Sequence, residues 1–404
     1  MSFVIGVLGL LFLIFIHEGG HFVVARLVGM NPRKFYLGFP PAIVKTNRNG
    51  IEYGVGAIPL GGYVKIPGMH RPAARDLDMH FGRAVEEDAS LRRPVDDLRQ
   101  ELAESDYVAA DGALERVRGT IAEASLSPLA RKTAERGLTE IGDALAPDAY
   151  WKAKTWKRVA VIFAGPAANV VFAIVIFTAL LMVASGGYRL GFELRASGNQ
   201  ATATIHRVLV GTPAADAGLR PGDRVVAING KAVDGESIPP TIRASRGDPL
   251  RLTVNRGGKT LQLRPVRPDK VERPSLVEAA GRSFGDTWWV TKQIGGSVSR
   301  LVTGEGRKEI SSPIGIVQGS SDAVKEGTDA YLWVLGLISL SLALLNLLPL
   351  LPLDGGHIAF SLVEGIRGKA VAREVYERVS VVGIAVVLLL FFVGLSNDIG
   401  RLGN

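Results

Sequence analysis

The sequence predicts a membrane α-helical bundle of four transmembrane helices, with a mostly-β domain on the extracytoplasmic side and a helical insert on the cytoplasmic side. Two observations lead to this fold class. Four apolar runs each approach the roughly 20 residues that a helix needs to cross a bilayer, and they lie at about 2–28, 159–185, 331–351 and 379–396. Long polar stretches separate the first run from the second and the second from the third, so each can hold a domain outside the membrane.

Composition and charge agree with a membrane protein. The chain has 404 residues, of which 47% are hydrophobic, which suits a membrane core with a further domain. It contains no cysteine, so any metal must be held by histidine, aspartate or glutamate. The net charge of +8 would suit a nucleic-acid partner if it were patterned, but the basic residues flank the apolar runs. By the positive-inside rule the loops after the first span, before the second, and between the third and fourth are cytoplasmic, and both termini lie outside.

The first element, residues 1–30, is predicted to be a transmembrane helix. A cleaved signal peptide is the alternative, but the start Met-Ser-Phe has no basic n-region, the apolar run is too long, and no small-residue cleavage site follows it. The helix contains His17, Glu18 and His21. Ionisable residues inside a membrane span usually mark a functional site.

Two segments with different characters separate the first span from the second. In 51–68 apolar residues alternate with glycines between prolines, which predicts a short hairpin or looped strand in a membrane-associated segment, 31–68. The charged, aromatic-poor stretch 69–150 has helical spacing, and Ser127-Pro128 supplies a cap and a first-turn proline. This stretch clusters no catalytic residue types, so we interpret it as a small cytoplasmic helical insert that covers or tethers another part.

The second half of the chain is predicted to alternate membrane helices with one β domain. A second transmembrane helix is expected at 156–185. A hairpin around Gly257 and Gly258 and an Asn229-Gly230 turn indicate a compact mostly-β domain at 186–268. Segment 269–330 is expected to contain an amphipathic helix at the membrane surface and a linker; a helix that packs on the β domain is the alternative. The remaining transmembrane helices are expected at 331–353 and 375–396.

The candidate catalytic pattern is His17-Glu18-Gly19-Gly20-His21. Residues four apart on a helix share a face, so both histidines can reach one metal ion while Glu18 lies beside them. In the H-E-x-x-H arrangement two histidines bind Zn²⁺ and the glutamate is the general base. Two buried histidines bonded to backbone carbonyls are the alternative, but that role leaves Glu18 unexplained in an apolar helix.

A catalytic zinc ion normally takes three protein ligands, so a third is expected at the same membrane depth. Asp354 is the candidate, because the third span runs in the same direction as the first and both end on the cytoplasmic side. Pro349 and Pro352 should break the helix there, and Asp354 should begin a Gly-Gly turn. A plain turn or capping role is the alternative for Asp354, and His357 and Glu364 are alternative ligands.

Five stretches, taken in order, resemble the bacterial site-2 intramembrane metalloproteases. They are HEGGH, AGPAAN at 164–169, GTPAADAGLRPGDRVVAING at 211–230, SSPIGI at 311–316 and NLLPLLPLDGGH at 346–357. The resemblance covers the whole chain except the insert at 69–150. Besides the insert, the chain departs from the family pattern at two points. It has one β module, the one that contains the stretch at 211–230, where some members have two in tandem. It also has Ser311-Ser312-Pro313 where Ser-Gly-Pro is usual.

The resemblance implies a role for each matched residue. The implied zinc ligands are His17, His21 and Asp354, and the implied catalytic base is Glu18. Residues 208–233 would belong to a PDZ domain, and the loop that contains Gly61 and Gly62 would be a membrane re-entrant β-loop whose edge binds an unwound substrate. Asn346 is similar in position to an asparagine that helps to hold the substrate backbone.

The function implied by the resemblance is that of a zinc-dependent intramembrane endopeptidase. It would hydrolyse peptide bonds within or near the transmembrane segments of single-pass proteins, namely anti-sigma factors or signal-peptide remnants, in regulated intramembrane proteolysis. The expected partners are these substrates, the lipid bilayer and a substrate end bound by the PDZ domain, with no nucleic acid. The expected location is the inner (cytoplasmic) membrane, with the PDZ domain outside and the active site toward the cytoplasm.

Two other classes of function compete with the peptidase. One is a non-enzymatic membrane PDZ adaptor with structural histidines, against which the intact Glu18 argues. The other is a metal transporter that uses His17, His21 and Asp354 as a transient site. A transporter more often shows polar residues along several spans than a single closed site.

Overall fold

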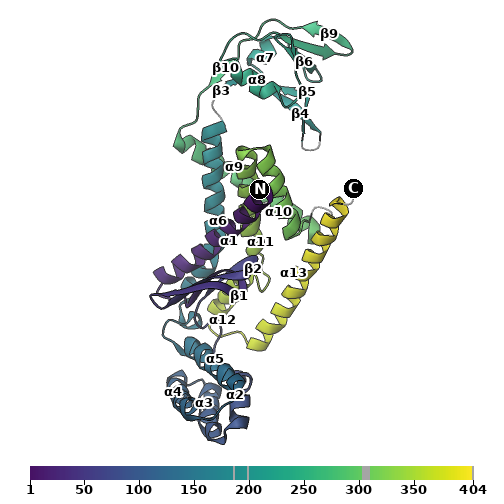
Figure 1. Cartoon of the computed structure of the whole chain (residues 1–404). Coiled ribbons are helices and arrows are strands. Elements are labelled where there is room, and N and C mark those ends of the chain that lie inside the picture. Colours follow the sequence, from purple (N-terminus) through teal and green to yellow (C-terminus); the bar gives the residue numbers. More distant parts are fainter. Residues whose placement is uncertain (185–186, 198–199, 303–309, 403–404) are drawn as a thin grey trace. The chain divides into compact units, whose positions relative to one another are not determined.

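The computed structural model describes residues 1–184, 187–197, 200–302 and 310–402 (Figure 1). The chain divides into two compact units, one formed by Met1–Ala173 with Thr287–Asn404 and the other by Ile174–Asp286. Within the described residues, four helices are long and apolar enough to cross a membrane. They are α1 (Ser2–Leu27) and the larger parts of α6 (Thr155–Ala184), α11 (Thr328–Asn346) and α13 (Arg373–Leu402). These helices identify a multi-pass membrane protein.

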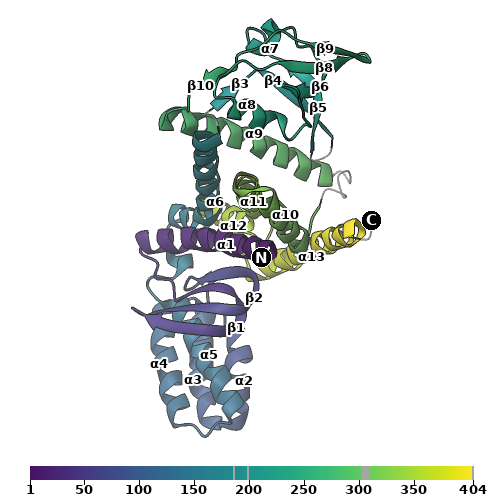
Figure 2. The same ribbon diagram turned by 45° about the horizontal axis from the view of Figure 1, so that its top comes forward.

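Helix α1 packs closely on two other helices of the first unit (Figure 2). A Cβ atom on Gly6 would lie 3.0 Å from the Val317 carbonyl oxygen of α10 (Pro313–Glu326), and one on Gly9 would lie 2.3 Å from the Tyr331 hydroxyl of α11. The Tyr331 hydroxyl donates a hydrogen bond to the Ile5 carbonyl oxygen at 3.2 Å. Small residues thus let the neighbouring helices approach α1, as is common in membrane bundles.

Two long bent strands, β1 (Lys34–Arg48) and β2 (Ile51–Lys65), form a sheet beside α1. The register pairs residues 34–37 with both 52–55 and 62–65, and 42–48 with 51–56. The sheet therefore has four short segments in the order 42–48, 51–56, 34–37 and 62–65, which leaves 62–65 at one edge. On one face, the ring of Phe35 meets those of Phe15 and Phe22 of α1 edge-on, at centroid distances of 5.8 and 5.4 Å.

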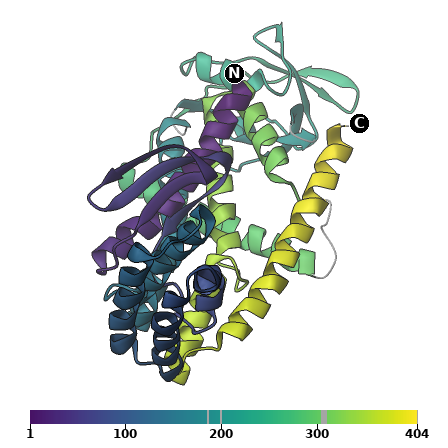
Figure 3. The same cartoon turned by 60° about the horizontal axis from the view of Figure 1, so that its bottom comes forward.

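The stretch predicted to be a helical insert contains α2 (Asp76–Glu87), α3 (Arg92–Glu104), α4 (Tyr107–Glu123) and α5 (Pro128–Leu145), with the short 3₁₀ helix η1 (Ala89–Leu91) (Figure 3). Ser127 caps α5 by accepting a hydrogen bond from the Ala130 N–H at 3.3 Å. The helices enclose their own apolar core, which includes Leu77, Phe81, Leu91, Leu98, Leu114, Val117 and Leu138. A second 3₁₀ helix, η2 (Tyr150–Lys152), leads from this bundle to α6.

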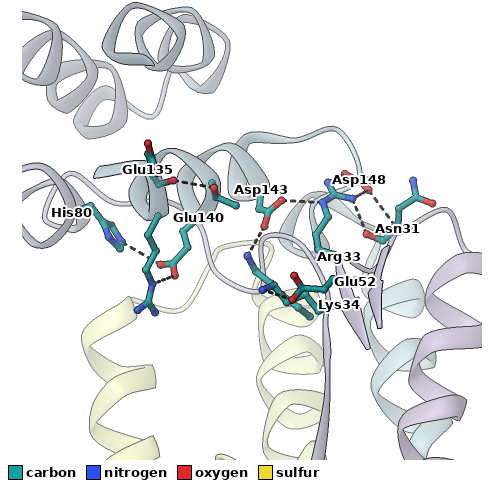
Figure 4. Close-up of polar contacts among 12 residues, drawn as sticks. Asn31, Arg33, Lys34, Glu52, His80, Glu135, Glu140, Asp143 and Asp148 are labelled. Atoms are coloured by element: carbon teal, nitrogen blue, oxygen red, sulfur yellow. Dashed lines mark hydrogen bonds and ion pairs between the residues drawn. The ribbon is translucent and has the colours of Figure 1, made fainter. Parts of the chain in front are cut away.

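Ion pairs attach the insert to the sheet (Figure 4). The guanidinium group of Arg33 donates to both carboxylate oxygens of Asp148, at 3.0 Å each, and to Asp143 at 2.9 Å. The ammonium group of Lys65 lies 2.7 Å from the other oxygen of Asp143. Bidentate arginine–carboxylate pairs fix orientation as well as distance. Helix α5 is therefore held in a defined position over the sheet.

The second unit is mostly β. Its main sheet has the order β4-β5-β6-β8-β9 with β7 paired to β6, and β3 pairs with β10 separately. The strands are β3 (Gly187–Arg189), β4 (Phe192–Ser197), β5 (Gln200–Val208), β6 (Arg224–Ile228), β7 (Lys231–Ala232), β8 (Leu252–Arg256), β9 (Lys259–Gln262) and β10 (Asp269–Val271), with helices α7 (Pro213–Asp216) and α8 (Ile238–Ala244). The pairing of Arg256 with Lys259 confirms the hairpin predicted around Gly257 and Gly258. Ile205, Ile228, Leu252 and Val254 lie in this unit's own core.

The third transmembrane helix breaks near Pro349 and Pro352, as the sequence predicts, and ends before the end of the predicted segment 331–353. Helix α11 ends at Asn346, residues 347–353 are not helical, and a further helix, α12, spans Asp354–Arg367. Pro349 and Pro352 have no N–H to continue the helix, which explains the break. Asp354 is therefore the first residue of a helix and does not begin the predicted turn.

Segment 269–330 contains two helices, α9 (Leu276–Val302) and α10, where one helix and a linker were predicted. The SSPIGI motif forms the start of α10, because the Ser312 hydroxyl accepts a hydrogen bond from the Ile314 N–H at 3.2 Å. Part of the predicted linker, 303–309, lies outside the described residues, as does the predicted boundary at 185–186.

Candidate metal centre

The three predicted zinc ligands lie close together, although His17 and His21 are near the N-terminus of the chain and Asp354 is near its C-terminus. Nε2 of His17 is 3.1 Å and Nε2 of His21 is 3.4 Å from Oδ2 of Asp354, and the two Nε2 atoms are 3.3 Å apart. Both histidines are buried, with 7% of each residue exposed. Within the described residues, this is the group of His, Asp and Glu side chains whose ligand atoms lie close enough to hold a metal ion.

The hydrogen bonds of the group leave two acceptor atoms close together, Nε2 of His21 and Oδ2 of Asp354. Nδ1 of His21 lies 2.8 Å from the carbonyl oxygen of Val161. A carbonyl can only accept, so Nδ1 carries the proton and Nε2 of the neutral ring keeps its lone pair. Oδ2 of Asp354 is buried without a hydrogen-bond donor among the described residues. The lone pairs of these two atoms repel one another unless a proton or a metal cation lies between them.

The spacing of the three atoms suits zinc. Zinc binds histidine nitrogen and carboxylate oxygen at about 2.0–2.2 Å in tetrahedral geometry, which places neighbouring ligand atoms about 3.3 Å apart. The three distances here, 3.1, 3.3 and 3.4 Å, match the edges of such a tetrahedron. The hydrogen bond from His21 to a backbone carbonyl is the type of outer contact that orients metal-binding histidines. The residues therefore fit a zinc ion with one position left for water or substrate.

Helix α6 reaches His21 because glycines lie where α1 and α6 cross. A Cβ atom on Gly20 would lie 2.3 Å from the Ala164 carbonyl oxygen, and one on Gly165 would lie 2.3 Å from Nε2 of His21. Either contact is too short for a real side chain, so both positions require glycine. The AGPAAN motif signalled this contact in the sequence, but sequence reasoning assigned no role to Gly165 or to the carbonyl of Val161.

Two further glycines position Asp354 at the start of α12. A Cβ atom on Gly355 would lie 2.2 Å from the Leu347 carbonyl oxygen, and one on Gly356 would lie 2.6 Å from the Leu351 backbone nitrogen. The first turn of α12 can therefore fold back onto the preceding loop. A carboxylate in the first turn also interacts favourably with the helix dipole.

The alternative ligands have other partners. The ring of His357 is hydrogen-bonded to the hydroxyl of Tyr376. Glu364 accepts hydrogen bonds from Arg158 at 2.6 Å and from the Val371 N–H at 2.9 Å. Asp354 is thus the carboxylate that meets the two histidines.

The remaining predicted site residues divide into two groups. Glu18 and Gly62 are neighbours: a Cβ atom on Gly62 would lie 2.9 Å from Cγ of Glu18. Gly61 instead faces the ring of Phe39, and the Asn346 side chain donates to the Leu342 carbonyl of its own helix at 3.0 Å. The structure therefore brings Glu18 and Gly62 together beside the metal ligands, whereas Gly61 and Asn346 make contacts elsewhere.

Comparison with known proteins gives matches over nearly the full chain. A family model described as Peptidase family M50 matches residues 5–390. The zinc metalloprotease RasP of Geobacillus kaustophilus is 30% identical over 429 residues, which cover 96% of this chain and 95% of that protein. The protein named "Probable protease eep" of Enterococcus faecalis is 28% identical over 425 residues, with 96% of each chain covered.

Likenesses to solved structures cover about a fifth of the chain. The HtrA-type protease AlgW with a decapeptide is 26% identical, with a TM-score of 0.20, and the likeness covers 22% of this chain and 31% of that one. The HtrA3 PDZ domain bound to a phage-derived ligand is 21% identical, with a TM-score of 0.19, and the likeness covers 21% of this chain and 88% of that one.

Proposed function

This chain belongs to peptidase family M50, and from that premise we propose that His17, His21 and Asp354 hold its zinc ion and that Glu18 is the general base. The protein is a zinc-dependent intramembrane endopeptidase, as expected for a relative of zinc metalloproteases with four apolar helices. The observation that carries the assignment is the meeting of two histidine nitrogens and one carboxylate oxygen, from α1 and α12, at distances of 3.1–3.4 Å. The family favours the peptidase over the adaptor and the transporter.

The chain's own residues supply positioning and proton transfer. When bound, zinc acts as a Lewis acid that polarises a peptide carbonyl and lowers the pKa of water to about 7. Glu18 takes the proton of the attacking water and passes it to the leaving amine. The hydrogen bond from His21 to Val161 holds Nε2 of His21 toward the metal.

The sheet of β1 and β2 is the proposed re-entrant β-loop that receives an unwound substrate. A peptide that pairs with the 62–65 edge passes Glu18, because Gly62 adjoins that side chain. Gly62 has no side chain to obstruct the substrate backbone. Gly61 directly precedes this edge in β2 and is proposed to contact the same substrate. Asn346 is proposed to contact the substrate backbone after its amide leaves the carbonyl of Leu342.

The other parts have proposed roles on the two sides of the inner membrane. Residues 186–268 form an extracytoplasmic PDZ domain that binds a substrate end, and the insert at 69–150 is cytoplasmic, as is the side of the active site. Helix α9 lies on the membrane surface, which is supported by the exposure of Phe284, Trp288 and Trp289. The substrates are single-pass proteins, namely anti-sigma factors or signal-peptide remnants.

The decisive experiment measures bound zinc and cleavage of a single-pass reporter protein in detergent. Glu18→Gln should retain zinc and lose about 10²–10⁴-fold in cleavage rate, the usual effect of a general base. Asp354→Asn should weaken zinc binding, because a charged ligand is replaced by a neutral one.

His357→Gln is the matched control, and it should keep its zinc because His357 bonds to Tyr376 instead. Cleavage at the wild-type rate by Glu18→Gln would mean that the base is wrongly assigned. A wild-type protein with neither zinc nor cleavage would favour the adaptor.

A further inference from the structure

The edge of the sheet at 62–65 turns part of its backbone away from β1. The Arg33 N–H donates to the Lys65 carbonyl at 2.7 Å, so the backbone groups of Lys65 face β1. Successive residues of a strand turn these groups to opposite sides, so those of Gly62 face outward. The Val64 carbonyl oxygen already accepts a hydrogen bond from the Ile66 N–H at 3.1 Å. The backbone of Val64 also interacts with the Glu18 carboxyl group. A peptide that pairs with this edge therefore runs directly past Glu18.

The two faces of this edge have different neighbours. Gly62 and Val64 face α1, as the closeness of Gly62 to Glu18 shows. Tyr63 and Lys65 face the other way, where Lys65 pairs with Asp143 of α5. Side chains alternate along a strand, so every second side chain of an added peptide points toward α1 and the others point toward the insert.

A cavity of about 670 Å³ lies on the side of the insert. Its lining includes the edge itself, Tyr63 to Ile66, and residues of α5, among them Leu129, Lys132 and Arg136. Cavities of roughly 300–1,000 Å³ are typical of ligand sites. We call this cavity the insert cleft.

The insert cleft has more cations than carboxylates. Its lining contains five cationic residues, Lys65, Arg71, Lys132, Arg136 and Arg373, and three acidic ones, Asp76, Glu140 and Asp143. Each acidic residue is already paired: Asp76 with Arg373 at 2.5 Å, Glu140 with Arg136 at 2.7 Å and Asp143 with Lys65 at 2.7 Å. Arg71 lies over the Trp151 ring, and Lys132 has no carboxylate within ion-pair distance among the described residues.

The walls of the insert cleft are held in place from two sides. Arg33 and Lys65 tie α5 to the sheet through Asp143 and Asp148 (Figure 4). Asp76 at the start of α2 accepts hydrogen bonds at 2.6 and 2.5 Å from Arg373, at the start of α13. The cleft is thus built by packed elements and contains an excess of positive charge beside Lys132.

We propose that the insert cleft binds the cytoplasmic flank of the substrate. This flank joins the 62–65 edge as an added strand, and an acidic side chain of the flank points toward Lys132. The insert then contributes to substrate specificity by recognising a part of the substrate that lies outside the membrane. The inference rests on the proposed function, because the same peptide must lie beside Glu18 when it is cleaved.

Disulfide cross-linking tests the position of the substrate, because the chain has no cysteine of its own. Lys132→Cys is made in the Glu18→Gln background, so that a single-pass reporter protein stays uncleaved. The reporter carries one cysteine at successive positions of its cytoplasmic flank. We expect cross-links at every second position, the period of a strand.

Arg116→Cys is the matched control, because Arg116 is exposed on α4 and does not line the cleft. Cross-linking that is equal for Lys132→Cys and Arg116→Cys, or that lacks the two-residue period, overturns the proposal.

Charge reversal tests the acidic side chain. Lys132→Glu should lower cleavage of a reporter with Asp at the cross-linking position by about tenfold, because like charges then meet. The same variant should raise cleavage of a reporter with Lys at that position, and Arg116→Glu should change neither. Equal effects of Lys132→Glu on both reporters overturn the proposal. Failure of the wild type to cleave either reporter would instead contradict the proposed function.

Discussion

Gly19 and Gly20 are adjacent in the HEGGH motif but have different surroundings. A Cβ atom on Gly20 would lie 2.3 Å from the Ala164 carbonyl oxygen, whereas one on Gly19 would have no atom within 4 Å. Gly20 is followed directly by His21, whose ring is held by the Val161 carbonyl on the same neighbouring helix. The position of a metal-binding side chain therefore depends on the absence of a side chain at the residue before it.

Gly20→Ala should displace α1 from α6 and weaken zinc binding, while Gly19→Ala should not. Overpacking by one methyl group costs about 1–3 kcal/mol where the neighbour is backbone. The measurement is bound zinc per protein during titration with a chelator. Equal zinc retention by the two variants would show that the crossing of α1 and α6 does not control the site.

At the scale of the element, the sheet of β1 and β2 packs against α1 with one face and carries an ion-pair network on the other. Glu52 on this second face lies 2.9 Å from the Lys34 ammonium and accepts a hydrogen bond from the Tyr36 hydroxyl at 2.8 Å. The pairing with Lys34, helped by Tyr36, lowers the pKa of Glu52 to about 2. The charged form of Glu52 thus stabilises the sheet that carries the 62–65 edge.

Glu52→Gln should lower the melting temperature at pH 7 by a few degrees, and the difference from the wild type should shrink in acid. A carboxyl group with a lowered folded-state pKa stabilises the protein above its unfolded pKa of about 4.3. That stabilisation is lost as the pH falls toward about 2, the folded pKa of Glu52. Thermal unfolding of both proteins in detergent at pH 7 and pH 3 measures this. A difference that is independent of pH would show that Glu52 acts by packing alone.

At the scale of the whole molecule, the site and the β domain belong to different units. His17, His21, Glu18 and Asp354 all lie in the unit formed by Met1–Ala173 and Thr287–Asn404. The second unit has a separate apolar core. Metal binding and recognition by the β domain are therefore expected to be separable.

Replacing residues 187–268 by a short flexible linker should leave bound zinc unchanged and reduce discrimination between full-length and shortened substrates. The reason is that the proposed PDZ domain selects substrates without contributing a metal ligand. The measurement compares cleavage rates of the two substrates by the deleted and intact proteins. Preserved discrimination would remove the proposed selective role, and loss of zinc would contradict the independence of the units.

Much of the element plan could be predicted from the sequence, because it depends on local patterns. Run length located the four apolar helices, and alternation located the hairpin at Gly257 and Gly258. The break between α11 and α12 was expected from Pro349 and Pro352, but the helix after it was missed. Helix α12 was missed because its apolar run is short and because it starts with two glycines, which are typical of a turn. In the structure Gly355 and Gly356 allow close packing and do not form a turn.

The sequence by itself determined that this chain spans a membrane and carries an H-E-x-x-H pair on its first helix, because hydropathy and the 3.6-residue period act within one segment. Only the tertiary structure decided that Asp354, and not His357 or Glu364, meets His17 and His21. The physical reason is that this choice depends on contacts between segments distant in sequence. The glycine crossings position the helices, and Tyr376 and Arg158 engage the other two candidates.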